Sequence, residues 1–314
     1  MTEKTKKIPV PLLPTMVGAM TLSNVLAGKG FTLIRPFMMI LSTFIFLAYT
    51  MKIIKHPEVK KKELSNVIPA SLFPGYFMMM MLLSSFYVDY AYAFGKALWL
   101  LAIVLHGIYI LIFTYRYVIK DRSLDNLFPT WYVTYNGILV SSVIGGAMNE
   151  PAITQALAYF GLFPYFILLP FQIYKLVKRG LAISSYHSHA ILLAPASLTF
   201  VSLINSGASV PLWLLYLLYA CIFLTLIYIL YRTPYSFSVD WSPGYAGLTF
   251  PMAIGTVASG LMANLLESNG HAKLAFIVGQ VQWTQIFFTI VFVGYVLIRF
   301  RGMQINSKEK LPEK

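Results

Sequence analysis

The sequence has little charge and almost no cysteine. Only 11% of its 314 residues are Asp, Glu, Lys or Arg, and Cys221 is the single cysteine. Soluble domains carry about 25% charged residues, so this composition excludes an ordinary soluble globular domain. One cysteine also excludes a disulfide framework and a cysteine-based metal cluster.

Motifs of enzymatic chemistry are missing as well. The sequence contains no HExxH zinc motif, no GxSxG nucleophile elbow and no nucleotide-binding loop. Five of its apolar segments, described below, have no Asp, Glu, Lys or Arg in their middle thirds. Because ionisable residues within a membrane usually mark proton relays or ion sites, their absence argues against a tightly coupled pump. We expect no enzymatic activity, no cofactor and no metal ion.

Long apolar runs fill the chain instead. Hydrophobic residues make up 58% of it, and the mean hydropathy is +0.70. Runs of about 20 apolar residues are long enough to cross a bilayer as helices. We therefore predict an all-α polytopic membrane protein, one transmembrane domain over residues 1–314 with ten membrane-spanning helices. They are expected near 10–28, 32–54, 67–88, 91–118, 128–147, 152–177, 187–206, 209–231, 244–266 and 272–300.

A repeated unit organises these segments. Pro14, Pro74, Pro129, Pro195 and Pro251 mark alternate segments and are separated by 60, 55, 66 and 56 residues. A regular period of this size indicates one supersecondary unit copied along the chain. The unit is a proline-marked segment of small residues followed by a bulky apolar segment ending in Lys or Arg. The sequence thus predicts five transmembrane hairpins.

The two members of each hairpin differ in composition. Small residues let helix backbones approach closely in lipid, and proline frees a carbonyl group that lipid cannot satisfy. We expect the five proline-marked helices to surround a lumen and the five bulky helices to face acyl chains. The alternative is that small residues and prolines only ease packing in a solid bundle.

Cations are distributed unevenly between the two predicted sides. Of the 24 Lys and Arg residues, only Lys29, Arg35, Lys96 and Lys273 fall on the side away from the termini. The positive-inside rule then predicts a plasma (inner) membrane protein with both termini in the cytoplasm. The net charge of +13 could suggest a nucleic-acid partner, but the cations sit at the ends of spans, so we expect none.

Several segments resemble one family of transport proteins. Ile8-Pro9-Val10-Pro11 with Gly18 and Leu22-Ser23-Asn24 is similar to the first span of bacterial members of the tellurite-resistance/dicarboxylate transporter family. Four further segments resemble later odd spans of that family: "IPASLFPGYFMMMML", "FPTWYVTYNGILVSSV", "LAPASLTF" and "YAGLTFPMAIGTVA". The family includes the bacterial tellurite-resistance membrane protein, the fungal malate permease and the plant slow anion channels.

This resemblance implies a fold and a gate. The implied fold is five helical hairpins with quasi-fivefold symmetry around a central pore, assembled as a homotrimer with one pore in each protomer. The gate it implies is a phenylalanine on the ninth span, which corresponds to Phe250 here. A hydrophobic constriction of this kind closes a pore by excluding water. A phenylalanine that only packs in an apolar helix is the alternative.

Further candidate pore residues surround this position. We expect Gly18, Gly75, Gly137 and Gly255 to leave room for the Phe250 ring to move. The residues expected to line or kink the pore are Gly18, Pro74, Gly75, Pro129, Gly137, Pro195, Pro251 and Gly255. At the cytoplasmic mouth, His187 and His189 could contact anions or respond to pH, since histidine titrates near neutrality. They could equally be polar ends of a helix.

The leading hypothesis is a passive, channel-like pore or uniporter for small anions. The substrates would be inorganic anions or C4-dicarboxylates such as malate, and the other partner is the lipid bilayer. Positive helix N-termini and basic residues at the cytoplasmic mouth would concentrate anions there. The alternative is a proton-coupled carrier for C4-dicarboxylates or a tellurite-related substrate.

Overall fold

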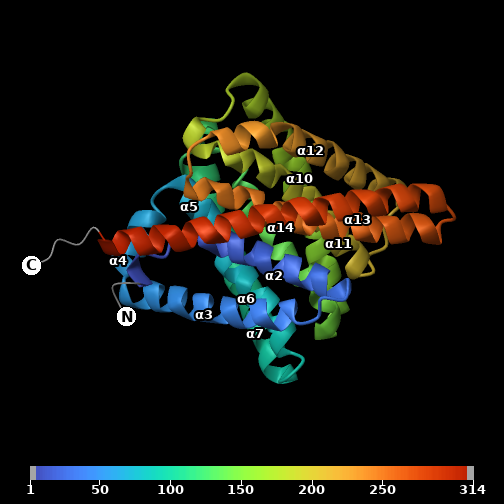
Figure 1. The fold of residues 1–314 in the computed structure, drawn as a ribbon, viewed down its shortest axis with the longest axis horizontal. Helices are drawn as coiled ribbons and strands as arrows, with labels where there is room; N and C mark the ends of the chain where they lie inside the picture. The colour runs from blue at the N-terminus through green and yellow to red at the C-terminus, as the bar shows by residue number, and fades with distance from the viewer. Residues whose placement is uncertain (1–4, 310–314) are drawn as a thin grey trace, which may run out of the picture.

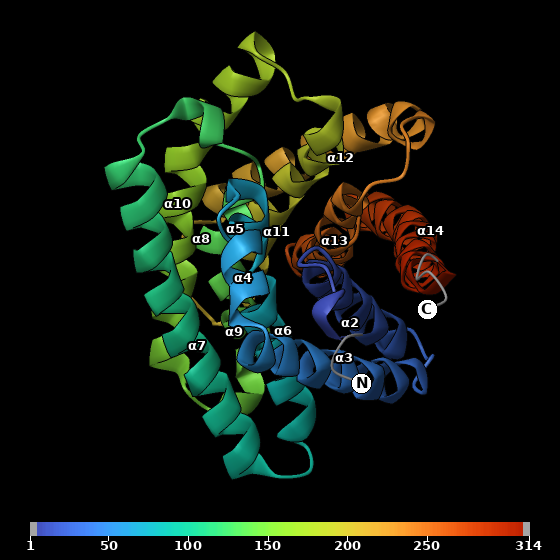
Figure 2. The same cartoon turned by 90° about the vertical axis from the view of Figure 1, so that its left-hand side faces the viewer.

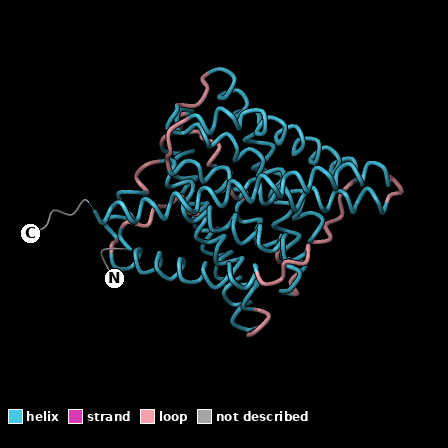
Figure 3. The backbone as a smooth tube through the Cα atoms, in the orientation of Figure 1, coloured by secondary structure: helices cyan, strands magenta, loops and turns pink. Residues whose placement is uncertain are grey.

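The computed structural model describes residues 5–309, and every regular element in that range is a helix (Figure 3). Within it, eight helices are long and apolar enough to cross a membrane, and Leu12–Gly28 is a shorter apolar helix. Because lipid offers no partners for backbone groups, a sequence this apolar must satisfy them within helices. The prediction of an all-helical, multi-pass protein is confirmed.

The helices form two sets. The bulky set comprises α3 (Ile34–Lys55), α7 (Tyr92–Thr114, continued by a π-helical turn, Tyr115–Lys120), α10 (Pro151–Lys178), α12 (Leu212–Ser238) and α14 (Ala272–Glu309). The proline-marked set comprises α2 (Leu12–Gly28), α5 (Val67–Leu72) with α6 (Gly75–Tyr87), α8 (Trp131–Tyr135) with α9 (Val140–Val143), α11 (Leu193–Asn205) and α13 (Phe250–Ser268). A short helix, α4 (Pro57–Glu63), lies in the longest connection between two spans.

The two sets occupy different layers. Figure 2 shows α3, α7, α10, α12 and α14 at the periphery, around the proline-marked helices. In three inner spans, 78–89% of the residues of the apolar stretch are buried. In the five peripheral spans, only 22–39% of these residues are buried. Side chains such as Phe37, Leu111 and Phe163 are exposed on the outer layer, where lipid would cover them. This is the arrangement that the alternation of small and bulky segments predicts.

Each marking proline sits at or just before the beginning of a helix. Pro14, Pro195 and Pro251 lie in the first turns of α2, α11 and α13, while Pro74 and Pro129 directly precede α6 and the turn into α8. A proline costs little there because its missing N–H has no helical partner to lose. In the seventh and ninth segments, short 3-10 helices (Ile183–Leu192 and Pro243–Leu248) precede the main helix, so the expected kinks are joints between two helical pieces.

The third proline-marked segment, which is the fifth of the ten predicted spans, departs from the prediction of one helix over 128–147. It is divided into α8, a 3-10 turn (Gly137–Leu139), α9 and a second 3-10 turn (Gly145–Met148). Gly137, Gly145 and Gly146 disfavour a continuous helix. Side chains of the segment bind neighbouring backbone instead: Asn136 Nδ2 donates to the carbonyl oxygen of Gly161 at 3.0 Å, and Ser142 Oγ donates to that of Thr154 at 2.8 Å. Both bonds run to α10 and hold the divided segment against that helix.

The described chain begins and ends on one side of the molecule. The end of α3, helix α4 and the end of α14 lie on the left of Figure 1, and the turn between α13 and α14 lies at the opposite edge. We call the first the terminal side and the second the far side.

Candidate functional site

Two cavities lie along the axis of the inner layer. The far-side cavity has a volume of about 390 Å³, and the terminal-side cavity a volume of only about 10 Å³. All five proline-marked segments contribute residues to each. The far-side cavity is lined by Thr21, Asn24, Val25, Gly28, Lys29, Leu82, Val140, Val143, Ile144, Asn205, Phe250, Ile254, Val257, Gly260, Leu261, Asn264 and Gln282. The terminal-side cavity is lined by Pro14, Leu72, Met78, Tyr132, Val133, Gly137, Ile191, Ala194, Leu198, Ala246, Gly247, Phe250 and Pro251.

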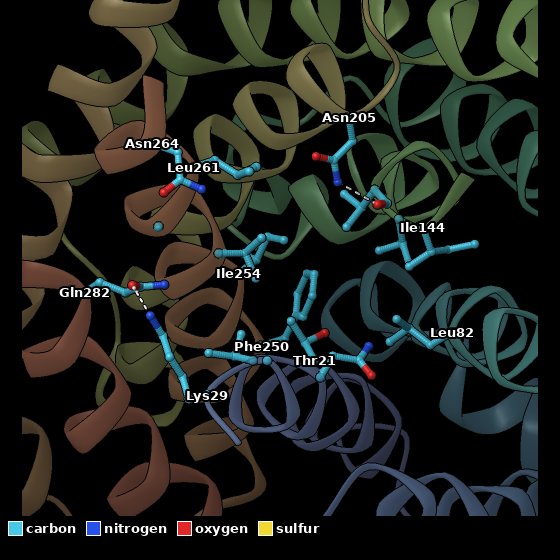
Figure 4. Close-up of a pocket in the computed structure, with 17 residues that line it drawn as sticks. Thr21, Lys29, Leu82, Ile144, Asn205, Phe250, Ile254, Leu261, Asn264 and Gln282 are labelled. Atoms are coloured by element: carbon cyan, nitrogen blue, oxygen red, sulfur yellow. Dashed lines mark hydrogen bonds between the residues drawn. The ribbon is translucent and has the colours of Figure 1, made fainter. Parts of the chain in front are cut away.

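Phe250 belongs to both linings. It is the first residue of α13 and only 3% exposed, and Figure 4 shows its ring projecting into the space between Ile254, Leu82 and Ile144. A cavity needs roughly 10–15 Å³ to hold one water molecule. The terminal-side cavity therefore holds at most about one water molecule, so the space beside Phe250 does not admit a hydrated ion in this conformation.

The backbone of Phe250 is held by a close helix contact. A Cβ atom built at Gly18 would lie 2.6 Å from the backbone nitrogen of Phe250 and 2.9 Å from the carbonyl carbon of Thr249. Only glycine allows α2 to approach α13 this closely at this point. Gly18 thus fixes the start of α13 and, with it, the direction in which the Phe250 ring leaves the helix.

The other predicted glycines are also packed against neighbours. A Cβ at Gly75 would meet Pro14 at 3.0 Å, one at Gly137 would meet Met78 Sδ at 2.8 Å, and one at Gly255 would meet Gln285 Nε2 at 2.9 Å. The expectation that Gly18, Gly75, Gly137 and Gly255 leave open room for a moving ring is therefore wrong. They allow close packing of the elements around the ring.

The far-side cavity is polar at one end and carries a single charge. Lys29 is the one Lys, Arg, Asp, Glu or His among its described lining residues. Its ammonium group donates to Gln282 Oε1 at 3.1 Å and lies 5.0 Å from the centre of the Trp283 ring. Asn24, Asn205 and Asn264 add three carboxamides to the lining, and Figure 4 shows Asn205 across the cavity from Lys29.

The terminal-side cavity is nearly apolar. None of its described lining residues is Asp, Glu, Lys, Arg or His. Tyr132 supplies the hydroxyl group of this lining, and that hydroxyl is buried without a hydrogen-bond partner.

His187 and His189 do not line either cavity. Both are buried, with exposures of 0 and 1%. His187 Nε2 lies 2.9 Å from the carbonyl oxygen of Ser236 and its ring stacks on Tyr245, while His189 Nδ1 lies 2.7 Å from the carbonyl oxygen of Tyr186. Their positions fit the alternative of packed polar residues at a helix end better than that of mouth contacts.

The remaining predicted residues divide into two groups. Gly137 and Pro251 line the terminal-side cavity, as does Phe250. Gly18, Pro74, Gly75, Pro129, Pro195 and Gly255 lie in the inner layer but are absent from both linings. Their contribution is to helix packing and to the joints between helical pieces.

Sequence reasoning missed the polar lining of the far-side cavity. A signal was present, because Asn24 follows Pro14 by ten residues and Asn205 follows Pro195 by ten residues. Equivalent positions of a repeated unit face the same axis, so this register could have identified both residues. Gln282 belongs to α14, a peripheral helix, and reaches the site through its contacts with Thr256 and Lys29.

Comparison with known proteins identifies the family. Among curated proteins, no match to the sequence was found. The family model described as "voltage-dependent anion channel" (SLAC1) matches residues 8–300, which cover nearly the whole membrane portion. This family contains anion channels and transporters rather than enzymes, and it includes the tellurite-resistance/dicarboxylate transporters that the sequence resembles. The chain belongs to the voltage-dependent anion channel family and is a multi-pass membrane protein of anion transport.

Proposed function

We propose that the protein is a passive, gated pore for small anions, with Phe250 as its gate. The substrates are inorganic anions or small carboxylates such as malate. The observation that carries the proposal is the position of Phe250 between two cavities to which all five proline-marked segments contribute. A ring at a narrow apolar site closes a pore by excluding water, and its removal opens the path.

The mechanism follows from the charges along the path. Below Phe250 the lining offers no fixed charge, so ions are not trapped there and can leave rapidly. With a negative cell interior, an outward-moving monovalent anion gains about 2.3 kcal/mol per 100 mV. An uncoupled pore would therefore favour efflux.

The proposal includes an orientation and an assembly. Ten membrane crossings, with the divided fifth segment as one of them, are arranged with quasi-fivefold symmetry about the pore. The terminal side faces the cytoplasm and the far side faces outward, in the plasma (inner) membrane. The trimer is carried over from the family resemblance.

The test is current through planar bilayers with ion substitution. Phe250→Ala is expected to raise anion conductance at least tenfold over the wild type, because it removes the apolar barrier. The matched control is Phe200→Ala, since Phe200 is also fully buried in the inner layer but lines neither cavity. A folded Phe250→Ala protein with unchanged conductance would remove this residue from the gate.

A second measurement separates the pore from a carrier. Proteoliposomes loaded with a pH indicator report whether protons accompany the anion. The pore predicts flux that follows the membrane voltage without proton movement. Obligatory proton movement would instead establish the proton-coupled dicarboxylate or tellurite-related carrier.

A further inference from the structure

The far-side cavity combines features that suit an anion of several atoms. At about 390 Å³ it far exceeds the roughly 10–15 Å³ that holds one water molecule, so a bare halide would leave most of it to solvent. No carboxylate is among its described lining residues. Its single charge is the ammonium group of Lys29.

The ammonium group of Lys29 is held in place. It donates to Gln282 Oε1, and Gln282 is itself oriented because its Nε2 donates to the carbonyl oxygen of Thr256 at 3.1 Å. Gln282 is 8% exposed, so this support is buried. A lysine ammonium has three donors, which leaves two for a ligand or for water.

Asn24 presents a donor to the same cavity. Arg35 Nε donates to Asn24 Oδ1 at 3.2 Å, and an arginine side chain has no acceptor, so the carboxamide oxygen must face Arg35. Its Nδ2 group is then the end available to the cavity. Arg35 is paired with Asp89 at 3.1 Å, so it fixes the orientation of Asn24 while its own charge is balanced.

The C-terminal ends of three inner helices place partial negative charge on the far side, which Lys29 offsets. Helices α2, α11 and α13 all end on the far side, with Gly28, Asn205 and Ser268 as their last residues. The C-terminal end of a helix carries a partial negative charge of about half a unit. Without Lys29, which directly follows the end of α2, this end of the path would repel anions.

Asn205 presents a hydrogen-bond acceptor to the cavity, whereas Lys29 and Asn24 present donors. Its Nδ2 donates one hydrogen to the carbonyl oxygen of Val143 at 2.8 Å, which leaves its Oδ1 as an acceptor and its second N–H as a donor. Across from Lys29, such an oxygen suits a hydroxyl group or water rather than a second carboxylate (Figure 4).

We infer that the far-side cavity is a binding site for a small organic anion, whose carboxylate group contacts Lys29 and Asn24. The inference rests on the proposed function in one respect, since the site lies on the proposed conduction path. It adds a specificity site to that path, distinct from the gate. Anions arriving from the far side bind there before they reach Phe250.

Binding can be tested without transport. Malate is expected to raise the melting temperature of the detergent-solubilised wild-type protein, and chloride at equal ionic strength is not. Lys29→Met should weaken the apparent malate affinity at least fivefold, and Lys29→Arg should retain it. The matched control, Lys273→Met, removes an exposed far-side lysine outside the cavity and should behave as wild type.

Two results would overturn the inference. One is a wild-type protein that malate stabilises no more than chloride does. The other is a Lys29→Met protein that responds to malate as Lys273→Met does.

A flux measurement separates this inference from the proposed function. In bilayers containing Phe250→Ala, the additional change Lys29→Met should raise the half-saturating malate concentration at least fivefold when malate is supplied from the far side. No effect of Lys29→Met on that concentration would contradict a site on the path. Absence of anion current in every variant would refute the pore, while the melting experiment would still decide whether the cavity binds malate.

Discussion

Tyr132 and Tyr165 are neighbouring buried tyrosines in different surroundings. Their ring centres are 6.4 Å apart, and their exposures are 1 and 2%. Tyr132 lines the terminal-side cavity and its hydroxyl has no partner, whereas Tyr165 lines neither cavity. A buried donor without a partner costs about 1–3 kcal/mol of stability. That cost is understandable if the hydroxyl serves an ion that has lost its water at the constriction.

Replacing Tyr132 with phenylalanine should therefore separate transport from stability. In the Phe250→Ala background, Tyr132→Phe is expected to lower anion conductance about tenfold, the factor that corresponds to about 1.4 kcal/mol. The melting temperature should stay equal or rise, because no existing hydrogen bond is lost. Bilayer currents and thermal unfolding measure the two effects.

The control is the same substitution at the neighbouring tyrosine. Tyr165→Phe removes a hydroxyl outside the cavities and should leave conductance unchanged. Equal conductance of Tyr132→Phe and Tyr165→Phe would show that the Tyr132 hydroxyl does not contact the passing ion.

At the scale of elements, Lys52 joins three parts of the terminal side. It lies near the end of α3, and its ammonium group donates to Glu63 of α4 at 2.7 Å and to the carbonyl oxygen of Ile8 at 2.6 Å. The ring of Tyr49 lies 5.2 Å away. Lys52 is fully buried, while the Glu63 side chain is 28% exposed. The contact holds α4 and the residues before α2 against α3.

Removing this charge should loosen α4. Lys52→Met leaves Glu63 and the Ile8 carbonyl without their partner, and a loss of about 1–3 kcal/mol is expected, below the 3–5 of a fully buried pair because Glu63 is partly solvated. Limited trypsin digestion should then cut faster at Lys60–Lys62. The control is Lys55→Met, which removes an exposed lysine of the same helix. Equal digestion of both variants would show that Lys52 does not secure α4.

The sequence was most informative where composition alone decides the outcome. Small residues and prolines alternate with bulky apolar residues, and this pattern correctly predicted which helices lie inside, because burial follows directly from side-chain size and lipid exposure. It failed for the fifth segment. Its glycines were visible in the sequence, but the bonds from Asn136 and Ser142 to α10 cannot be read from the periodicity of a single sequence.

The candidate site was predictable in part. Phe250 was located through the "TFPM" motif, and its neighbours Gly137 and Pro251 do line a cavity. Lys29 was assigned only to topology, because the role proposed for it depends on its contact with Gln282 and on three helix ends that lie on the far side. His187 and His189 were expected at the mouth because they are polar and close to a helix start. In the structure both are buried, and each has a ring nitrogen within hydrogen-bond distance of a backbone carbonyl oxygen.

For the whole molecule, the proposed orientation in the membrane rests on the distribution of Lys and Arg between its two sides. The terminal side holds most of the cations, and Lys29, Arg35, Lys96 and Lys273 are the four that fall on the far side. Two of these are paired with acidic groups, Arg35 with Asp89 and Lys96 with Glu150. The positive-inside rule counts Lys and Arg rather than net charge, so the excess of these residues on the terminal side predicts that this side faces the cytoplasm.

Cysteine labelling in intact cells tests this orientation. Cys221 is the single native cysteine, and Cys221→Ser keeps a hydrogen-bonding group at its partly buried position in α12. In that background, Lys273→Cys places one thiol at the start of α14 on the far side, and Lys61→Cys places one in α4 on the terminal side; both positions are exposed. A membrane-impermeant maleimide should label Lys273→Cys in intact cells and Lys61→Cys only after permeabilisation. The reverse pattern would invert the proposed topology. The far-side cavity would then open toward the cytoplasm, where it would meet anions leaving the cell.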